Sequence, residues 1–256
     1  MCLILLDLHT HAAYPLTVAA NRDESYARPA TPAAWWPDAP GVLAGRDLLG
    51  GGTWMGVARD GRWAAVTNVR EPTVPQRANA PSRGALVADF LRGSASPAGY
   101  AAAIASRAGD WNGFNLLVGD ADSVWWLSNR APGPVLVEPG AHGVSNALLD
   151  TPWPKVVRGR HDVRRIVGGA ASVDEELFRA LALREPAPDA ELPDTGVGRE
   201  MERALSSPLI VTPGYGTRAS TVLRISASGE VTFAERTIDP AIGSWTEARH
   251  RFTIHR

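Results

Sequence analysis

The chain has 256 residues, enough for one large domain or two small ones with an ample core. Its formal net charge of -1 gives no field that would gather nucleic acid or an anionic membrane, so neither partner is expected. A single cysteine excludes an internal disulfide framework and suits a reducing compartment. No stretch approaches the roughly 18 to 20 apolar residues of a membrane span, and no basic region precedes the first apolar run, as a secretory signal requires. We therefore expect a cytoplasmic protein without integral membrane association.

Apolar runs bounded by glycine-rich or Asp-Gly turns predict successive antiparallel strands at 3–8, 16–20, 54–58 and 63–67. The apolar period then becomes helical, which predicts helices at 82–93 and 97–108. Strands follow at 114–118, 124–127, 135–137 and 143–145, and helices at about 154–167 and 173–183. The Pro- and Asp-rich segment 186–198 predicts a surface excursion or linker. A strand at 209–212 and a hairpin of 220–225 with 231–236 close the chain.

Blocks of strands therefore alternate with blocks of helices along the chain. This order predicts an α+β fold in which helices pack on antiparallel sheets. No internal repeat or low-complexity tract interrupts it, and we expect a single domain over residues 1–256.

Cys2 follows the initiator methionine and opens the first apolar run. Removal of Met1 would place a thiol and a free α-amino group on one residue, which could then supply both nucleophile and general base. The reference pKa of the amine is about 7.7 to 8.0 and that of the thiol about 8.5, close enough to exchange a proton near neutral pH. The alternative is that Cys2 is a small apolar residue starting a core strand, as most buried cysteines are.

Five polar clusters fall at the ends of predicted strands, where layered folds place their sites. They are Asn21 to Glu24, Gly50 to Val57 with Trp54, Thr67-Asn68, Ser145-Asn146, and Gly216-Thr217-Arg218. Taken alone, the first could be a solvated turn and the second a packing motif.

An N-terminal nucleophile needs fixed donors for the oxyanion of a tetrahedral intermediate, and Asn68 and Asn146 are of the right chemical type. It also needs an acceptor that orients the α-amine and a cation that favours thiolate. Asp23 and Arg218 suit those two roles. We expect Asp23, Asn146 and Arg218 to share one pocket with Cys2, with the sulfur within roughly 4 to 6 Å of at least two of them.

Several motifs in this order resemble the NRDE family, the family of transport and Golgi organisation protein 2. They are Met1-Cys2, Asn21-Arg22-Asp23-Glu24, Gly51 to Val57, Asn112 to Leu117, Ser145-Asn146 with Thr151 to Lys155, and Tyr215 to Arg218. The resemblance implies the N-terminal nucleophile hydrolase fold, a four-layer αββα sandwich similar to the cysteine acylases. It implies that Cys2 is the nucleophile, that Asp23 holds the α-amine, that Asn68 and Asn146 lie near the oxyanion, and that Arg218 lies beside the thiol.

The chain departs from the acylases at one position. There an arginine precedes the Asn-x-Asp pattern, whereas here Ala20 stands in its place and Arg22 falls between Asn21 and Asp23. Because adjacent side chains on a strand face opposite ways, we expect Arg22 not to stand beside Cys2 in place of that cation. We expect Asn21, Arg22 and Trp54 to contact the substrate instead.

Two functions remain open. The first is hydrolysis of a linear amide or related acyl bond by Cys2, without a cofactor. The second is a non-catalytic protein that uses the same pocket to bind and traffic haem or another hydrophobic ligand. No Cys-x-x-Cys-His haem signal is present, and His9 and His11 lack the third ligand that a metal site needs, so no metal is expected.

Overall fold

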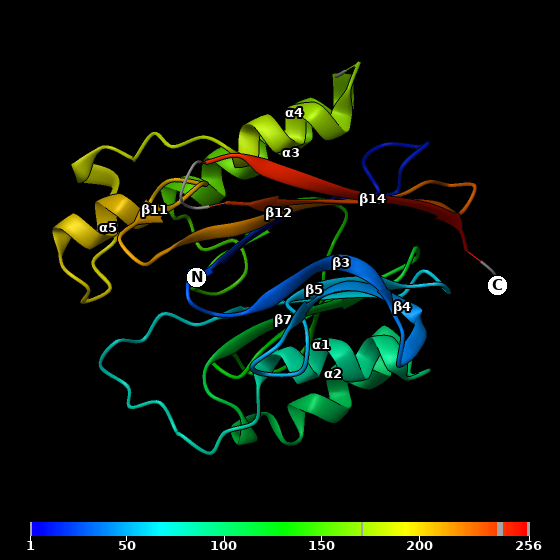
Figure 1. Cartoon of the computed structure of the whole chain (residues 1–256), viewed down its shortest axis with the longest axis horizontal. Coiled ribbons are helices and arrows are strands. Elements are labelled where there is room, and N and C mark those ends of the chain that lie inside the picture. Colours follow the sequence, from blue (N-terminus) through cyan, green and yellow to red (C-terminus); the bar gives the residue numbers. More distant parts are fainter. Residues whose placement is uncertain (1, 170, 240–242, 255–256) are drawn as a thin grey trace.

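The computed structural model describes residues 2–169, 171–239 and 243–254. Its strands form two antiparallel sheets that stack face to face, and helices cover the outer face of each sheet (Figure 1). The predicted α+β fold of two antiparallel sheets in four layers is therefore confirmed. The prediction of a single domain over residues 1–256 stays a prediction.

The first sheet carries the N-terminal strand. It contains β1 (Cys2–Leu8), β2 (Leu16–Ser25), β10 (Gly140–Val144), β11 (Val211–Thr212), β12 (Tyr215–Ile225), β13 (Glu230–Ile238) and β14 (Trp245–Thr253). The second sheet contains β3 (Ala30–Trp36), β4 (Ala39–Asp47), β5 (Met55–Ala58), β6 (Trp63–Asn68), β7 (Phe114–Gly119), β8 (Val124–Ser128) and β9 (Val135–Leu136). The helices are α1 (Arg83–Arg92), α2 (Pro97–Ala105), α3 (Pro154–Gly169), α4 (Val173–Leu181) and α5 (Arg199–Leu205), with 3₁₀ turns η1 (Ala108–Asp110) and η2 (Asp189–Glu191).

The strand order brings distant parts of the chain together. In the first sheet it is β10-β1-β2-β12-β13-β14, with β11 on β12, and in the second it follows the chain from β3 to β9. Strand β12, from the last fifth of the chain, therefore lies directly against β2, and β10, from the middle of the chain, lies against β1.

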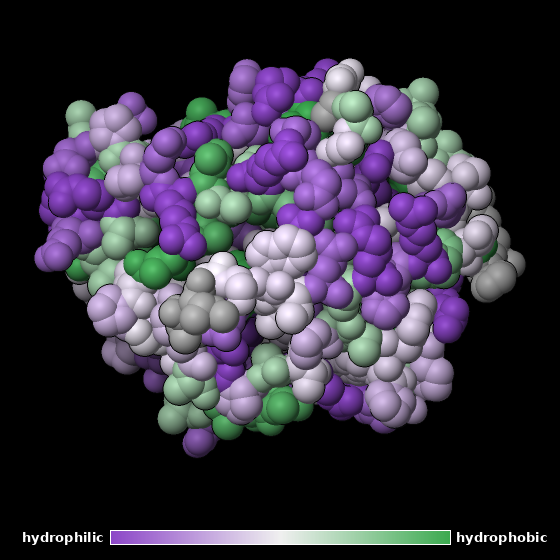
Figure 2. Space-filling model, turned by 45° about the horizontal axis from the view of Figure 1, so that its top comes forward, coloured by the Kyte–Doolittle hydropathy of each residue, from purple (hydrophilic) through white to green (hydrophobic). Residues whose placement is uncertain are grey.

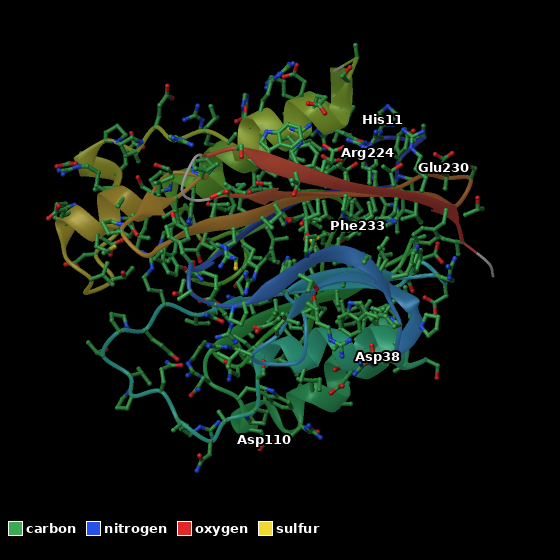
Figure 3. The ribbon with its side chains drawn as sticks, viewed as in Figure 1. His11, Asp38, Asp110, Arg224, Glu230 and Phe233 are labelled. Atoms are coloured by element: carbon green, nitrogen blue, oxygen red, sulfur yellow. The ribbon has the colours of Figure 1, made fainter. Side chains whose placement is uncertain are left out.

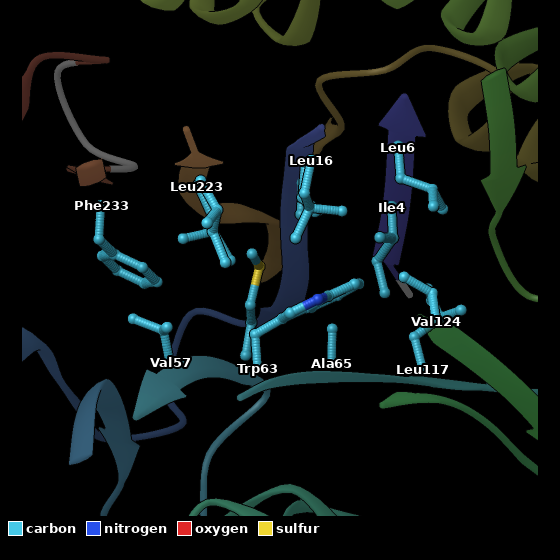
Figure 4. Packing of buried hydrophobic residues seen from close by; sticks show 14 of the residues in the cluster. Ile4, Leu6, Leu16, Val57, Trp63, Ala65, Leu117, Val124, Leu223 and Phe233 are labelled. Atoms are coloured by element: carbon cyan, nitrogen blue, oxygen red, sulfur yellow. The ribbon is translucent and has the colours of Figure 1, made fainter. Parts of the chain in front are cut away.

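The main core lies between the sheets. Side chains from the first sheet, such as Ile4, Leu6 and Phe233, meet Trp63 and Leu117 of the second (Figure 4). Figure 3 likewise shows Phe233 directed from β13 into this layer. The opposite face of the first sheet packs under α3 and α4, and α1 and α2 cover the second sheet.

Side chains along β1 alternate between these two environments. Ile4 and Leu6 point into the core between the sheets, whereas Leu3 and Leu5 point toward α3 and α4. The same alternation runs through β2, where Val18 and Ala20 face inward and Ala19 faces the helices. It decides the face on which each site residue lies.

Four elements were not predicted from the sequence: β3, β4, α5 and β14. The polar run Asn21 to Glu24 also lies inside β2 and not at its end, because β2 pairs with β1 as far as Arg22 and with β12 as far as Ser25. Arg22 and Glu24 line a cavity, whereas the side chains of Asn21 and Asp23 form buried hydrogen bonds.

The surface is mixed. Hydrophilic side chains predominate on the face shown in Figure 2, with hydrophobic ones in small separate patches. Within the described ranges, no helix is long and apolar enough to cross a membrane.

Candidate active site

Cys2 is the first residue of β1 and pairs with Arg22 of β2. Its even position places the thiol on the face turned toward the second sheet, at the end of the core. There it lines a cavity of about 510 Å³ together with Arg22, Asp23, Trp54 and Asn68. The only thiol of the chain therefore has access to a space of substrate size.

Arg22 stands beside the thiol, so the expectation that it could not do so is wrong. Directly opposed residues in an antiparallel pair share a face, and Arg22 is the partner of Cys2. Its side chain is 5% exposed and lies over the Trp54 ring, with Cζ 4.4 Å from the ring centroid. The guanidinium donates no hydrogen bond to any described residue, and its nearest carboxylate contact is Glu24 at 4.0 Å.

Further arginines surround the same cavity. Arg83, the first residue of α1, donates to the Gly113 carbonyl at 2.9 Å and acts electrostatically on Cys2. Arg28 is bound to Asp47 at 2.7 Å, and Arg77 completes the lining on this side. The thiol thus opens into a polar cavity rich in guanidinium groups.

Arg83 reaches the Cys2 cavity because the backbone at Gly52 lies close to the backbone at Gly84. A Cβ at Gly52 would lie 2.4 Å from the backbone of Gly84, so only glycine lets the 51–54 loop touch the start of α1. The Thr53 amide donates to the Gly84 carbonyl at 3.2 Å. The glycine motif that precedes Trp54 is therefore a packing device that shapes the cavity wall.

Asp23 lies directly after Arg22 and is almost fully buried. Its Oδ1 accepts a hydrogen bond from Thr217 Oγ1 at 2.6 Å, and Thr217 pairs with it across β2 and β12. Its backbone N–H lowers the pKa of the Cys2 thiol. Burial raises the pKa of the Asp23 carboxyl, and the Lys155 ammonium is the strongest influence that lowers it.

The thiol experiences opposing effects. Burial, the largest effect, and the Asp23 carboxylate raise the pKa of Cys2, whereas the positive amino terminus, the Asp23 N–H and the Arg22 guanidinium lower it. The net result is a pKa above the ordinary value for a thiol. Met1 itself lies outside the described residues. Its removal would transfer the amino terminus to Cys2, next to the thiol and within the field of Asp23.

The two asparagines lie at the junction of two cavities. Asn68 ends β6 with an exposed side chain, and it lines both the Cys2 cavity and a second cavity of about 530 Å³. Asn146 lines the second cavity, where its Nδ2 donates to the Asn68 carbonyl at 2.8 Å. The second cavity combines apolar residues with the charged Glu24, Arg70 and Glu71; the apolar ones include Val69, Pro72, Val74, Val197, Met201 and Leu205.

The strand end that carries Asn146 also holds Cys2. Ser145 Oγ donates to the Cys2 carbonyl at 2.8 Å, and Thr67 Oγ1 donates to the Ser145 carbonyl at 2.5 Å. These bonds connect β1, β6 and the residues after β10. They keep Cys2 and the two amides in one rigid group.

Arg218 occupies a different place from the one predicted. It is the extra residue of a bulge in β12, where the register with β2 shifts between Thr217 and Ala219. Its Nη1 donates to the carbonyls of Ser25, Tyr26 and Arg28, at 2.9 to 3.1 Å. Arg218 is therefore not among the residues that line the Cys2 cavity. Its hydrogen bonds stabilise the turn after β2.

Asn21 also differs from the expectation that it contacts substrate. Its odd position faces the helices, where Nδ2 donates to the Leu181 and Pro208 carbonyls at 2.9 Å. Its Oδ1 accepts a hydrogen bond from Ser220 at 2.6 Å. Asn21 thus fastens the end of α4 to the sheet.

His9 and His11 follow β1 in a turn and not on a strand. Among the described residues, no group of three or more His, Cys, Asp or Glu side chains could hold a metal ion.

Sequence reasoning missed Arg83 and Lys155. Nothing in the sequence distinguishes Arg83 from the other arginines. Lys155 carried a signal, because it is the only lysine of an arginine-rich chain and ends one of the motifs quoted above.

The fold and site together define a two-sheet α+β protein with a cavity-facing cysteine at the start of its first strand. A family model described as Transport and Golgi organisation 2 matches residues 1–240, and the chain belongs to this family. It is 37% identical to the Transport and Golgi organization protein 2 homolog of Bos taurus and 35% identical to that of Homo sapiens, over 94% of each chain. The Drosophila melanogaster protein is 29% identical over 96% of each chain.

Two solved structures are similar at lower levels. A Caenorhabditis elegans ortholog of N-acylethanolamine-hydrolyzing acid amidase has a TM-score of 0.49 and 9% identity, covering 87% of this chain and 92% of that one. A C2A mutant of the conjugated bile acid hydrolase from Clostridium perfringens has a TM-score of 0.45 and 9% identity, covering 99% and 92%.

Proposed function

We propose that this chain is an N-terminal cysteine nucleophile hydrolase that cleaves a linear amide or related acyl bond after Met1 is removed. The observation that supports it best is the position of Cys2, whose thiol faces the 510 Å³ cavity while the Asp23 N–H and the Arg22 guanidinium favour its thiolate. The proposal includes a small-molecule substrate and, because a lone cysteine suits a reducing compartment, a cytoplasmic location.

The reaction would proceed in two steps. The α-amino group takes the thiol proton, Sγ attacks the acyl carbon, and the amine passes that proton to the leaving group as the scissile bond breaks. Water then hydrolyses the thioester and regenerates the thiol. Asn68 at the junction of the cavities supplies amide donors for the oxyanion, and Asn146 fixes the Asn68 backbone.

The adjoining cavities supply a place for each half of such a substrate. The apolar cavity beyond Asn68 accommodates an acyl chain, and the polar cavity around Cys2 accommodates the leaving group.

Three measurements test the proposal. Intact-mass spectrometry shows whether Met1 is absent. A screen of acyl amides should find turnover in the wild-type protein and none in Cys2→Ala. A variant with an uncleavable N-terminal extension should lose turnover although its thiol is intact, because the base is blocked. Turnover that survives the extension would contradict the N-terminal nucleophile mechanism.

A second function is supported by the apolar cavity alone. A haem or hydrophobic-ligand carrier would need that 530 Å³ space and a few polar contacts but neither the thiol nor the α-amine. Tight haem binding, measured from the Soret band and equal in wild type, Cys2→Ala and the extended variant, together with absent turnover, would favour this carrier.

A further inference from the structure

The excursion between α4 and β11 is a loop whose hydrogen bonds are largely internal. Residues 187–206 contain η2 and α5 and stand out at one end of the sheets (Figure 1). The Thr195 N–H and hydroxyl donate to Glu202 Oε1 at 2.7 and 2.5 Å. The Ala187 N–H donates to Ser206 Oγ at 2.8 Å, which joins the two ends of the segment. The segment is therefore a self-contained unit with adjacent ends, as in an Ω-loop.

One buried ion pair attaches this loop to the body of the protein. Arg70, two residues after the end of β6, donates from Nη1 to Glu202 Oε2 at 2.7 Å and to Thr195 Oγ1 at 3.4 Å. The Arg70 side chain is 7% exposed and that of Glu202 is 2% exposed. Among the described residues, Arg70 makes every hydrogen bond and ion pair that joins 187–206 to the rest of the chain. The other contacts of the loop with the body are apolar.

The loop also forms one wall of the second cavity. Apolar side chains of the loop and of the segment after β6 line this 530 Å³ space together: Val197, Met201 and Leu205 with Val69, Pro72 and Val74. A Cβ at Gly196 would lie 3.5 Å from Pro72 Cγ, so the loop touches the body at this wall. Movement of the loop away from the body would open the cavity on that side.

Arg70 belongs to the body and not to the loop. Its backbone N–H donates to the Asn146 carbonyl at 2.7 Å, and its Cζ lies 4.5 Å from the centroid of the Trp153 ring. Asn146 in turn donates to the Asn68 carbonyl at 2.8 Å. Because these contacts fix Arg70 beside the candidate site, separation of the ion pair would release the loop and leave Arg70 in place.

We propose that segment 187–206 is a cover of the second cavity, and that the Arg70–Glu202 ion pair holds it closed and so controls the entry of a linear apolar chain. The closed cover encloses the chain and excludes water from the junction at Asn68. The assignment of that chain to the acyl half of a substrate rests on the proposed function. The cover itself would serve any ligand with such a chain.

The unique cysteine makes chain entry measurable. Cys2 lines the polar cavity and Asn68 lines both cavities, so a reagent can react with the thiol while its chain lies in the second cavity. Iodoacetamide and N-octyl iodoacetamide carry the same reactive group, and the ratio of their alkylation rates reports the effect of the chain. In Arg70→Met the octyl reagent should gain roughly tenfold in this ratio, because the uncompensated charge of Glu202 favours the open cover. Glu202→Gln keeps the side-chain shape and should raise the ratio in the same direction.

Two further variants separate opening of the cover from damage to the site. Arg70→Met combined with Glu202→Leu replaces the ion pair by apolar side chains, which pack well in the closed cover, so the ratio should return to about the wild-type value. General damage would not be reversed by the second substitution. Arg203→Met is the control: it breaks an exposed ion pair with Asp189 inside the loop and should leave the ratio unchanged.

Hydrogen exchange measures the cover without an alkylating reagent. The amides of 187–206 should exchange faster in Arg70→Met than in wild type, whereas those of β1 and β2 should keep their rates. In Cys2→Ala, which cannot cleave an amide through the thiol, saturating octanamide should slow exchange of the 187–206 amides because the enclosed chain holds the cover closed.

An equal alkylation ratio in wild type, folded Arg70→Met and Glu202→Gln would overturn the inference, and so would exchange in 187–206 that octanamide does not slow. Amide turnover on the same preparations distinguishes the two proposals. A released cover in the variants with no turnover in wild type contradicts only the hydrolase function. Turnover in wild type whose dependence on acyl-chain length is the same in Arg70→Met contradicts only the cover.

Discussion

Glu235 is a buried carboxyl whose protonation should control the stability of the sheet sandwich. It lies on β13 with 1% exposure, and its Oε1 accepts a hydrogen bond from the Ala33 N–H of β3 at 2.8 Å. Its Oε2 accepts one from Thr221 at 3.3 Å. Glu235 thus joins the first sheet to the second across the core.

Burial raises the pKa of Glu235 from 4.5 to about 7. The unfolded chain therefore loses its proton at lower pH than the folded protein, so this contribution to stability is complete below pH 4.5 and is lost as pH rises through about 7. The difference of about 2.5 pKa units corresponds to about 3 kcal/mol of folding free energy lost at alkaline pH.

Glu235→Gln keeps an oxygen that accepts the Ala33 N–H and removes the titration. Its free energy of unfolding should match that of wild type near about pH 4 and exceed it by about 3 kcal/mol near about pH 8. Urea unfolding followed by the fluorescence of the nine tryptophans measures this at both pH values.

The control is Glu230→Gln, an exposed glutamate at the start of the same strand, which should change stability by less than about 0.5 kcal/mol at either pH. A constant difference between wild type and Glu235→Gln across this pH range would refute the assignment of the raised pKa.

Three further outcomes are expected. Arg22→Met should slow iodoacetamide alkylation of Cys2 at pH 7 roughly tenfold, whereas Arg218→Met should leave the rate unchanged and loosen the turn after β2, measured by proteolysis at that turn. Asn21→Ala should cost about 2 to 3 kcal/mol in urea unfolding, because it leaves two buried carbonyls and a hydroxyl without their partner. Gly52→Ala should displace the start of α1 and lower the alkylation rate, because its Cβ would meet the Gly84 backbone; the same rate and stability as wild type would contradict the close approach.

Local patterns predicted most of the regular elements. Apolar runs with turn residues at both ends identified β1, β6 and β7, and helical periodicity identified α1 and α3, because their buried faces are continuous in sequence. β3 and β14 were missed because much of each strand is exposed, and β4 was missed although its residues 42–45 are buried. Their pairing partners, not their own residues, make them strands.

The site shows the same division. The position of Cys2 and the chemical types of Asp23 and Asn68 could be singled out from the sequence, because position and residue type are local properties. The neighbours of the thiol could not. Arg22 stands beside Cys2 because β1 and β2 pair in one particular register.

The sequence by itself therefore determined the fold class, the family and the candidate nucleophile. Only the tertiary structure decided which cations share its environment. A one-residue change of register or one bulge, such as that at Arg218, moves a side chain to another face of the sheet, and that choice depends on packing between segments far apart in the chain.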